Sequence, residues 1–321
     1  MKILVVQNRM GIGDMVIFLP YIEAIAKKFG VPVSILVKEN SKAIQFLKNN
    51  TNIDQIITLD RKNKTNNGNH DGIIGSYSLA RDLKKFNFDK VFIFNSSLRF
   101  NLIARAAGIK DVYQYPLFQK KNQHIINTAK KFIKKELNLE VESNPKILVN
   151  NQLIEDSKSK YKIDSDEINI LLGIGGSGPT KRVPAKIFID FMNLVSQKHK
   201  CKFFLATGKN NEEQKILREI LSTKYSDECC ALDDLSLKDI LPVIKNCNIS
   251  ICNDSSFSHL SSGLGIETIV LMSDTPLLYG SYSPRMHPII PDGEDTVAHN
   301  TFGKDRINPN KIFEKLNNIL Y

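Results

Sequence analysis

Three short segments of the sequence carry residue types that could do chemistry. The first, Gly-Ile-Gly-Asp at residues 11–14, follows an apolar run at residues 3–6 that is typical of a buried strand. Gly11 and Gly13 predict a tight turn, which places Asp14 at the start of a helix. An aspartate at that position could act as a general base or could cap the helix, and position alone is compatible with both.

The second segment, Gly-Ile-Gly-Gly-Ser-Gly at residues 173–178, has the glycine spacing of a dinucleotide-binding turn. A nicotinamide site would also need an acidic residue at the end of the next strand, but residues 202–206 lead into Thr-Gly-Lys. A dehydrogenase therefore stays only a third alternative. We interpret the segment as a flexible loop that delivers Thr180, Lys181 and Arg182, whose cations suit a diphosphate. Ordinary surface cations are the competing interpretation.

The third segment, residues 253–259, follows another apolar strand pattern and enters a short helix. Free backbone N–H groups at such a helix start bind anions, and the hydroxyls of Ser255 and Ser256 add donors. Asp254 and His259 have no third ligand at a convincing spacing, so we expect no metal. They also lie too close in sequence to a serine for a hydrolase triad. The alternative is an ordinary capped helix with a hydrogen-bonded histidine.

The elements that must position these segments alternate between strands and helices, which predicts an α/β fold with parallel sheets. Ligands bind at the carboxyl ends of the strands in such sheets, where all three segments fall. A polar region at residues 140–166 separates two such patterns, so we predict domains at residues 1–150 and 151–321. The predicted strands are residues 3–6, 33–37, 55–59, 91–94, 168–172, 202–206, 249–252 and 268–272. The predicted helices are residues 15–29, 41–48, 77–86, 98–107, 122–137, 184–197, 212–221, 237–245 and 309–320.

Composition supports two globular domains in a reducing compartment. The chain has 321 residues, of which 42% are hydrophobic and 24% charged, as in average globular proteins. Its five cysteines form no C-x-x-C pair, so we expect free thiols. The N-terminal apolar run becomes polar at Gln7, too early for a signal peptide, and no apolar run approaches the length of a membrane span. These features predict a cytoplasmic protein.

The formal net charge of +10 favours anionic partners. We expect nucleotide phosphates and an acidic glycolipid or glycan rather than nucleic acid. A Lys-rich segment at residues 120–135 extends this expectation to peripheral contact with the cytoplasmic face of the inner membrane. A compositional bias toward Lys, Asn and Ile is the alternative explanation of the charge.

With these residues placed, the chain resembles glycosyltransferase family 9, the lipopolysaccharide heptosyltransferase family. Residues 10–20 resemble the family's Gly-Asp block, and Lys-Arg-Val-Pro at residues 181–184 resembles its K-x-W-P element. Asp-Ser-Ser-Phe-Ser-His-Leu at residues 254–260 resembles its D-T-G-x-x-H-L block, and Gly208 followed by Glu212 or Glu213 resembles a fourth element. Three positions depart from the family pattern, namely Val183, Ser256 and Ser273.

The resemblance implies a GT-B fold, in which two Rossmann-like domains face each other across a cleft. The N-terminal domain would bind the acceptor, and the C-terminal domain would bind a nucleotide-diphosphate sugar such as ADP-heptose. The resemblance also assigns roles to single residues: Asp14 is the base, Lys181 contacts the donor phosphate, Glu212 holds the ribose, and the backbone at Ser255 and Ser256 binds the diphosphate.

The resulting function is inverting transfer of a sugar to a lipopolysaccharide-core or related envelope acceptor, without a metal or cofactor. One alternative is a GT-B-like sugar-nucleotide epimerase or hydrolase, which would release or convert the sugar without an acceptor. Another is a non-catalytic nucleotide-sugar-binding protein. The presence of Asp14, Lys181, Asp254 and His259 together argues against loss of catalysis.

Overall fold

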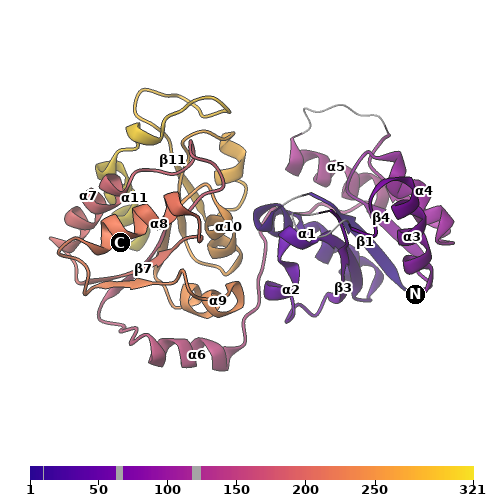
Figure 1. Ribbon diagram of the computed structural model, residues 1–321, viewed down its shortest axis with the longest axis horizontal. Helices are drawn as coiled ribbons and strands as arrows, with labels where there is room; N and C mark the ends of the chain where they lie inside the picture. The colour runs from indigo at the N-terminus through magenta and orange to yellow at the C-terminus, as the bar shows by residue number, and fades with distance from the viewer. Residues whose placement is uncertain (10, 63–67, 118–123) are drawn as a thin grey trace. The chain divides into compact units, whose positions relative to one another are not determined.

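The computed structural model describes residues 1–9, 11–62, 68–117 and 124–321. Met10, part of the predicted loop at residues 61–72, and the start of the Lys-rich segment therefore lie outside the described residues. The chain divides into two compact units, Met1–Pro145 and Lys146–Tyr321, which Figure 1 shows in indigo to magenta and in magenta to yellow. The sequence analysis placed this division at residues 150/151.

Unit 1 contains a parallel sheet of five strands in the order β3-β2-β1-β4-β5. Its central strand β1 is buried along its whole length, as expected for a parallel strand that helices cover on both faces. The strands are β1 Ile3–Gln7, β2 Val33–Lys38, β3 Ile53–Leu59, β4 Lys90–Ile93 and β5 Asp111–Gln114. The helices are α1 Ile12–Phe29, α2 Ala43–Phe46, α3 Gly72–Lys84, α4 Leu98–Ala106 and α5 Ile125–Leu137.

Unit 2 contains a parallel sheet of six strands in the order β11-β10-β9-β6-β7-β8. Helices α7 and α11 pack against each other (Figure 1). The strands are β6 Ile168–Gly173, β7 Cys201–Ala206, β8 Cys229–Ala231, β9 Ile249–Asn253, β10 Thr268–Leu271 and β11 Met286–Ile289. The helices are α6 Asn151–Lys160, α7 Ala185–Ser196, α8 Asn211–Leu221, α9 Leu237–Lys245, α10 Ser256–Gly263 and α11 Pro309–Leu320.

Both sheets have a point at which the direction of strand addition reverses. In unit 1 the reversal falls between β1 and β4, and in unit 2 it falls between β6 and β9. At such a point, neighbouring loops leave the carboxyl edge on opposite sides of the sheet and open a crevice. The segments after β1, β6 and β9 are the three that the sequence analysis selected.

The predicted elements are present, and the structure adds four that the sequence did not predict: β5, β8, β11 and α6. It also moves the start of α1 from residue 15 to Ile12, because Gly11 is the N-cap with φ 105° and ψ 156°. None of the helices that the structure describes is long and apolar enough to span a membrane.

Candidate functional site

Asn253, at the end of β9, ties both ends of the loop between β6 and α7 to the sheet. Its side-chain amide donates hydrogen bonds to the carbonyls of Ile174 (2.9 Å) and Gly175 (3.2 Å) in the glycine loop. Its Oδ1 accepts a hydrogen bond from the backbone N–H of Val183 at 3.3 Å. The segment that carries Lys181 is therefore fixed over the carboxyl end of β9. Val183, which departs from the aromatic family pattern, is fully buried in the core.

Lys181 and Asp254 form an ion pair at this edge, with Nζ and Oδ2 2.8 Å apart. Asp254 is almost completely buried, whereas the Lys181 side chain is 25% exposed. Burial raises the pKa of the Asp254 carboxyl, but the Lys181 charge and the hydrogen bonds from Lys181 and Thr275 outweigh it and lower this pKa below its usual value. The carboxylate is therefore ionised at neutral pH, and it holds the ammonium group where a donor phosphate could reach it.

His259 lies on the buried side of the same group and is neutral. The pKa of its imidazole falls to about 4, because burial lowers it most, Asp254 opposes this shift and the Lys181 charge adds to it. Its Nδ1 is 3.0 Å from the hydroxyl of Tyr282, and the two rings stack with centroids 5.5 Å apart. A neutral imidazole held in this way can exchange hydrogen bonds but adds no charge to the pocket.

The start of α10 supplies backbone donors beside this group. Ser255 is the N-cap, in an extended conformation and without a capping hydrogen bond from its own side chain. Its buried hydroxyl has no hydrogen-bond partner among the described residues. Ser256 begins the helix, and the first N–H groups of a helix have no partner within it. Several donors therefore meet the Lys181 ammonium at one edge, as the sequence predicted for an anion site.

The structure brings Glu213 to the glycine loop, whereas Glu212 is exposed on the surface of α8. Glu213 Oε1 accepts a hydrogen bond from the backbone N–H of Gly176 at 2.6 Å, and Oε2 accepts one from Asn210 at 2.5 Å. A Cβ at Gly208 would lie only 2.2 Å from Glu213 Oε2. The choice of Glu212 for the donor pocket is therefore corrected in favour of Glu213.

Thr180 contacts the segment that follows β10. Its carbonyl accepts a hydrogen bond from the Ser273 hydroxyl at 3.0 Å, and its own hydroxyl helps to lower the pKa of the Asp274 carboxyl. Asp274 also accepts a hydrogen bond from the Phe302 N–H at 3.0 Å. Ser273, another departure from the family pattern, thus anchors the loop that presents Lys181.

Asp14 in unit 1 is not an N-cap, so the structure removes that interpretation. Gly11 caps α1, and Asp14 lies in the first turn of the helix. Gly11 needs its glycine because of its positive φ, whereas Gly13 lies within the helix and has no such φ. Asp14 Oδ1 accepts a hydrogen bond from Arg9 Nε at 3.0 Å, and its side chain is 18% exposed. Part of the carboxylate can therefore meet a substrate.

Further cations lie at the ends of the strands next to Asp14. Burial lowers the pKa of Lys38, at the end of β2, and the charge of Arg61 lowers it further, while Asp14 opposes both effects. Burial and Arg61 likewise lower the pKa of Arg99, in the first turn of α4, while Asp71 opposes them. This basic group around an aspartate was missed in the sequence because its members are far apart in the chain.

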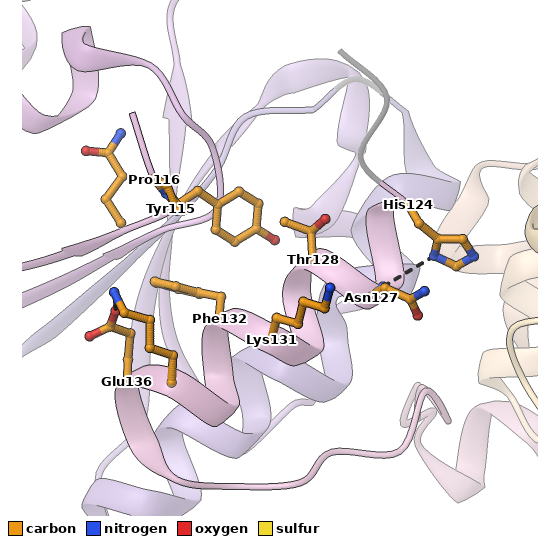
Figure 2. A pocket seen from close by; sticks show the side chains of 10 residues that line it. Tyr115, Pro116, His124, Asn127, Thr128, Lys131, Phe132 and Glu136 are labelled. Atoms are coloured by element: carbon orange, nitrogen blue, oxygen red, sulfur yellow. Dashed lines mark hydrogen bonds and ion pairs between the residues drawn. The ribbon is translucent and has the colours of Figure 1, made fainter. Parts of the chain in front are cut away.

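A pocket of about 380 Å³ opens between the end of β5 and α5 (Figure 2). Tyr115 and Phe132 form an aromatic wall, with ring centroids 5.1 Å apart. Thr128 and Lys131 project from α5 toward the same space in Figure 2. Aromatic and polar side chains in one cavity suit a sugar ring.

Across the described ranges, His, Cys, Asp and Glu side chains form no group of three or more that could hold a metal ion.

Two Rossmann-like units in one chain define the class as GT-B. Solved structures agree with this fold. A glycosyltransferase family 9 protein from Veillonella parvula has a TM-score of 0.79 at 19% identity, covering 99% of this chain and 97% of its own. E. coli ADP-heptose lps heptosyltransferase II has a TM-score of 0.73 at 16% identity, covering 100% of this chain and 98% of its own.

The chain belongs to glycosyltransferase family 9 (heptosyltransferase), whose profile matches residues 76–294. Lipopolysaccharide heptosyltransferase 1 of Campylobacter coli is 22% identical over 297 residues, which cover 84% of this chain and 83% of that protein. The predicted fold, family and enzyme class are thus confirmed: the protein is a glycosyltransferase.

Proposed function

We propose that the protein transfers a heptose from ADP-heptose to a lipopolysaccharide-core or related envelope glycan, with inversion at the anomeric carbon. The observation that carries this proposal is the grouping of Lys181, Asp254, His259 and the start of α10 at one sheet edge. Family membership supports glycosyl transfer. The names of the E. coli and Campylobacter coli relatives support the choice of sugar donor and glycan.

In this proposal unit 2 binds the donor. The diphosphate lies against the Lys181 ammonium and the first N–H groups of α10, which stabilise the charge that develops on the leaving group. Glu213 and the glycine loop border the nucleoside, and Thr180 lies on the side of the sugar. Asp254 keeps Lys181 in position. The residues that bind are fixed before the donor arrives, so little reorganisation is needed.

Asp14 is the base in the proposed reaction. The acceptor hydroxyl gives its proton to the Asp14 carboxylate while its oxygen bonds to the anomeric carbon. The bond from that carbon to the diphosphate oxygen breaks, and its electron pair leaves with the nucleoside diphosphate. A carboxylate with an ordinary pKa can serve in this role.

Unit 1 binds the acceptor in this proposal. The cations Arg9, Lys38, Arg61 and Arg99 suit an anionic glycan, and the pocket between β5 and α5 offers room for a sugar ring at the other side of the same sheet. The net charge and the lysines of α5 extend the proposal to peripheral contact with the cytoplasmic face of the inner membrane.

A thermal-shift screen of ADP-, UDP- and GDP-sugars tests the donor. A ligand at 100 times its dissociation constant stabilises the folded state by about 2.7 kcal/mol, so ADP-heptose should raise the unfolding midpoint and UDP-sugars should not. Product analysis then separates the alternatives. Rapid release or isomerisation of the sugar without an acceptor would support the hydrolase or epimerase and contradict transfer. Binding without turnover on any acceptor would support the non-catalytic protein.

A further inference from the structure

The outer faces of α3 and α4 form an exposed apolar surface that the fold of unit 1 does not need. The inner faces pack on the sheet through Leu79, Leu83 and Ile103. On the outer face, Ile73 is 91% exposed, Ile74 86% and Tyr77 75%, and Leu98 and Leu102 of α4 are also exposed. Scattered single apolar side chains are normal on a protein surface, but a contiguous group of large ones marks an interaction site.

Helices α3 and α4 pack side by side (Figure 1). An apolar groove of about 490 Å³ lies between their side chains. Ile73, Tyr77, Leu102, Ile103 and Ala106 line it, and Arg99 closes one end, where its Nε donates to the Ser76 hydroxyl at 2.9 Å. We call this groove and its exposed rim the α3–α4 face.

Cations border the α3–α4 face. Arg81 is exposed four residues after Tyr77, and Arg105 is exposed three residues after Leu102, so each lies next to an apolar member on the surface of its helix. Asp82, the acid beside Arg81, is engaged by Lys85 at 2.7 Å. An apolar strip with a cationic border is complementary to an anionic lipid surface, where apolar side chains enter the acyl boundary and Arg side chains meet headgroups.

The position of the face agrees with such contact. Helix α3 follows β3 and helix α4 follows β4, so both begin at the carboxyl edge of the sheet that holds Asp14. The Arg61 charge acts on both Arg99 and Lys38, and the Asp14 charge acts on Lys38. A lipid surface at the α3–α4 face would therefore hold a lipid-linked sugar on the side of the base.

We propose that the α3–α4 face docks the protein on an anionic lipid bilayer, with Ile73, Ile74 and Tyr77 entering the acyl boundary. The inference rests on the proposed function only in that the acceptor is linked to a lipid. Docking itself needs neither donor nor acceptor.

The chain contains no tryptophan, so the fluorescence of a single introduced tryptophan reports only on the surroundings of that position. In an Ile74→Trp variant, fluorescence should shift to the blue on vesicles of phosphatidylglycerol and phosphatidylethanolamine, and brominated lipid should quench it. Ile44→Trp on α2 and Leu153→Trp on α6 are matched controls at exposed apolar positions, and they should show neither effect.

Flotation with the same vesicles measures the contribution of the face. The Ile73→Ser/Ile74→Ser variant should lose roughly three- to tenfold in partitioning per isoleucine, since each isoleucine buries part of its apolar surface in the acyl boundary. A Lys130→Gln/Lys134→Gln variant of α5 should lose less. Ile73, Ile74 and Lys134 are exposed, and Lys130 is half-buried. The affinity for ADP, measured by calorimetry, should not change in either variant.

Three outcomes would overturn the proposal. The protein could float while the Ile74→Trp reporter stays unshifted, which would move contact to α5 or elsewhere. The reporter could shift without vesicles as protein concentration rises, which would make the face an interface between two copies. Finally, the protein could fail to bind anionic vesicles even at low salt. Failure of ADP-heptose turnover would instead count against the proposed function and leave the vesicle result intact.

Discussion

The carboxyl edges of the two sheets satisfy their charged groups in different ways. In unit 2, Lys181 forms an ion pair with the buried carboxylate of Asp254, and His259 is neutral. The charges of this group are therefore paired before a ligand binds. In unit 1, Asp14 pairs with Arg9, whose side chain is 45% exposed, and its charge also acts on Lys38 from β2. The first arrangement suits a small ligand of fixed shape, and the second suits a larger, anionic one whose position can vary. Four predictions test this contrast.

The largest effect is expected at Asp14. The Asp14→Asn variant keeps the size of the side chain but cannot accept the acceptor proton, so transfer should fall by about 100- to 10,000-fold. Because Gly11 is the cap, the free energy of unfolding should fall only by what a negative charge in the first turn of α1 contributes, about 0.3 to 1 kcal/mol. Transfer rate, ADP affinity and midpoint are measured on the same preparation. A near-normal rate would show that the base lies elsewhere.

Lys181→Ala should weaken binding of the nucleoside diphosphate by about ten- to a hundredfold, because one charge-assisted hydrogen bond is lost. It should also destabilise the fold, since the buried Asp254 carboxylate loses its partner.

The double variant Lys181→Met/Asp254→Asn separates these two effects. It should recover stability because no buried charge is left unpaired, yet calorimetry should find the diphosphate still weakly bound. Recovery of affinity in the double variant would mean that Lys181 acts only as a structural partner of Asp254.

His259 should make the stability of unit 2 depend on pH. Its pKa is about 4 in the folded protein and near 6.5 when unfolded, so the unfolded state binds more protons between these values. The stability that neutral His259 contributes is therefore fully present above pH 6.5. It is lost as the pH falls, by roughly 2 kcal/mol between pH 8 and pH 5. Denaturant titrations should show this loss in the wild type and in His199→Gln, but much less of it in His259→Gln. An unchanged pH dependence in His259→Gln would assign it to other groups.

The smallest effect separates two neighbouring glutamates. Glu213→Gln disturbs the carboxylate that accepts from Gly176, so ADP affinity should fall about tenfold, in line with the loss of one hydrogen bond to a charged group. Glu212→Gln, on the exposed side of the same helix turn, should stay within about twofold of wild type, well under 1 kcal/mol. The opposite ranking would restore Glu212 to the site.

Much of the fold follows from local patterns. Helices α9 and α11 begin and end at the predicted residues because each has apolar positions at helical spacing, and Asn308 and Pro309 mark the start of α11. The strands β5, β8 and β11 were missed because they are three or four residues long and lie at or near sheet edges. Pro288 in β11 also argues against a strand. Helix α6 was missed because its sequence is polar and packs lightly.

The candidate site was less predictable, because its contacts join distant parts of the chain. No local pattern pairs Lys181 with Asp254, which lie 73 positions apart, or brings Lys38 near both Asp14 and Arg61. One signal was present and was not used. Asn210 followed three residues later by Glu213 is a capping-box pattern, and Asn210 Oδ1 indeed accepts from the Glu213 N–H at 3.0 Å. That pattern turns Glu213, rather than Glu212, back toward the loop.

The contact between Gly208 and Glu213 extends to other sequences. Because the Glu213 carboxylate occupies the place where a side chain at 208 would begin, positions 208 and 213 share one volume. Among related chains that align through α8, a residue larger than glycine at 208 should therefore occur with a residue shorter than glutamate at 213. Two columns of an alignment would then indicate, without a structure, which relatives keep this form of the nucleotide-facing loop.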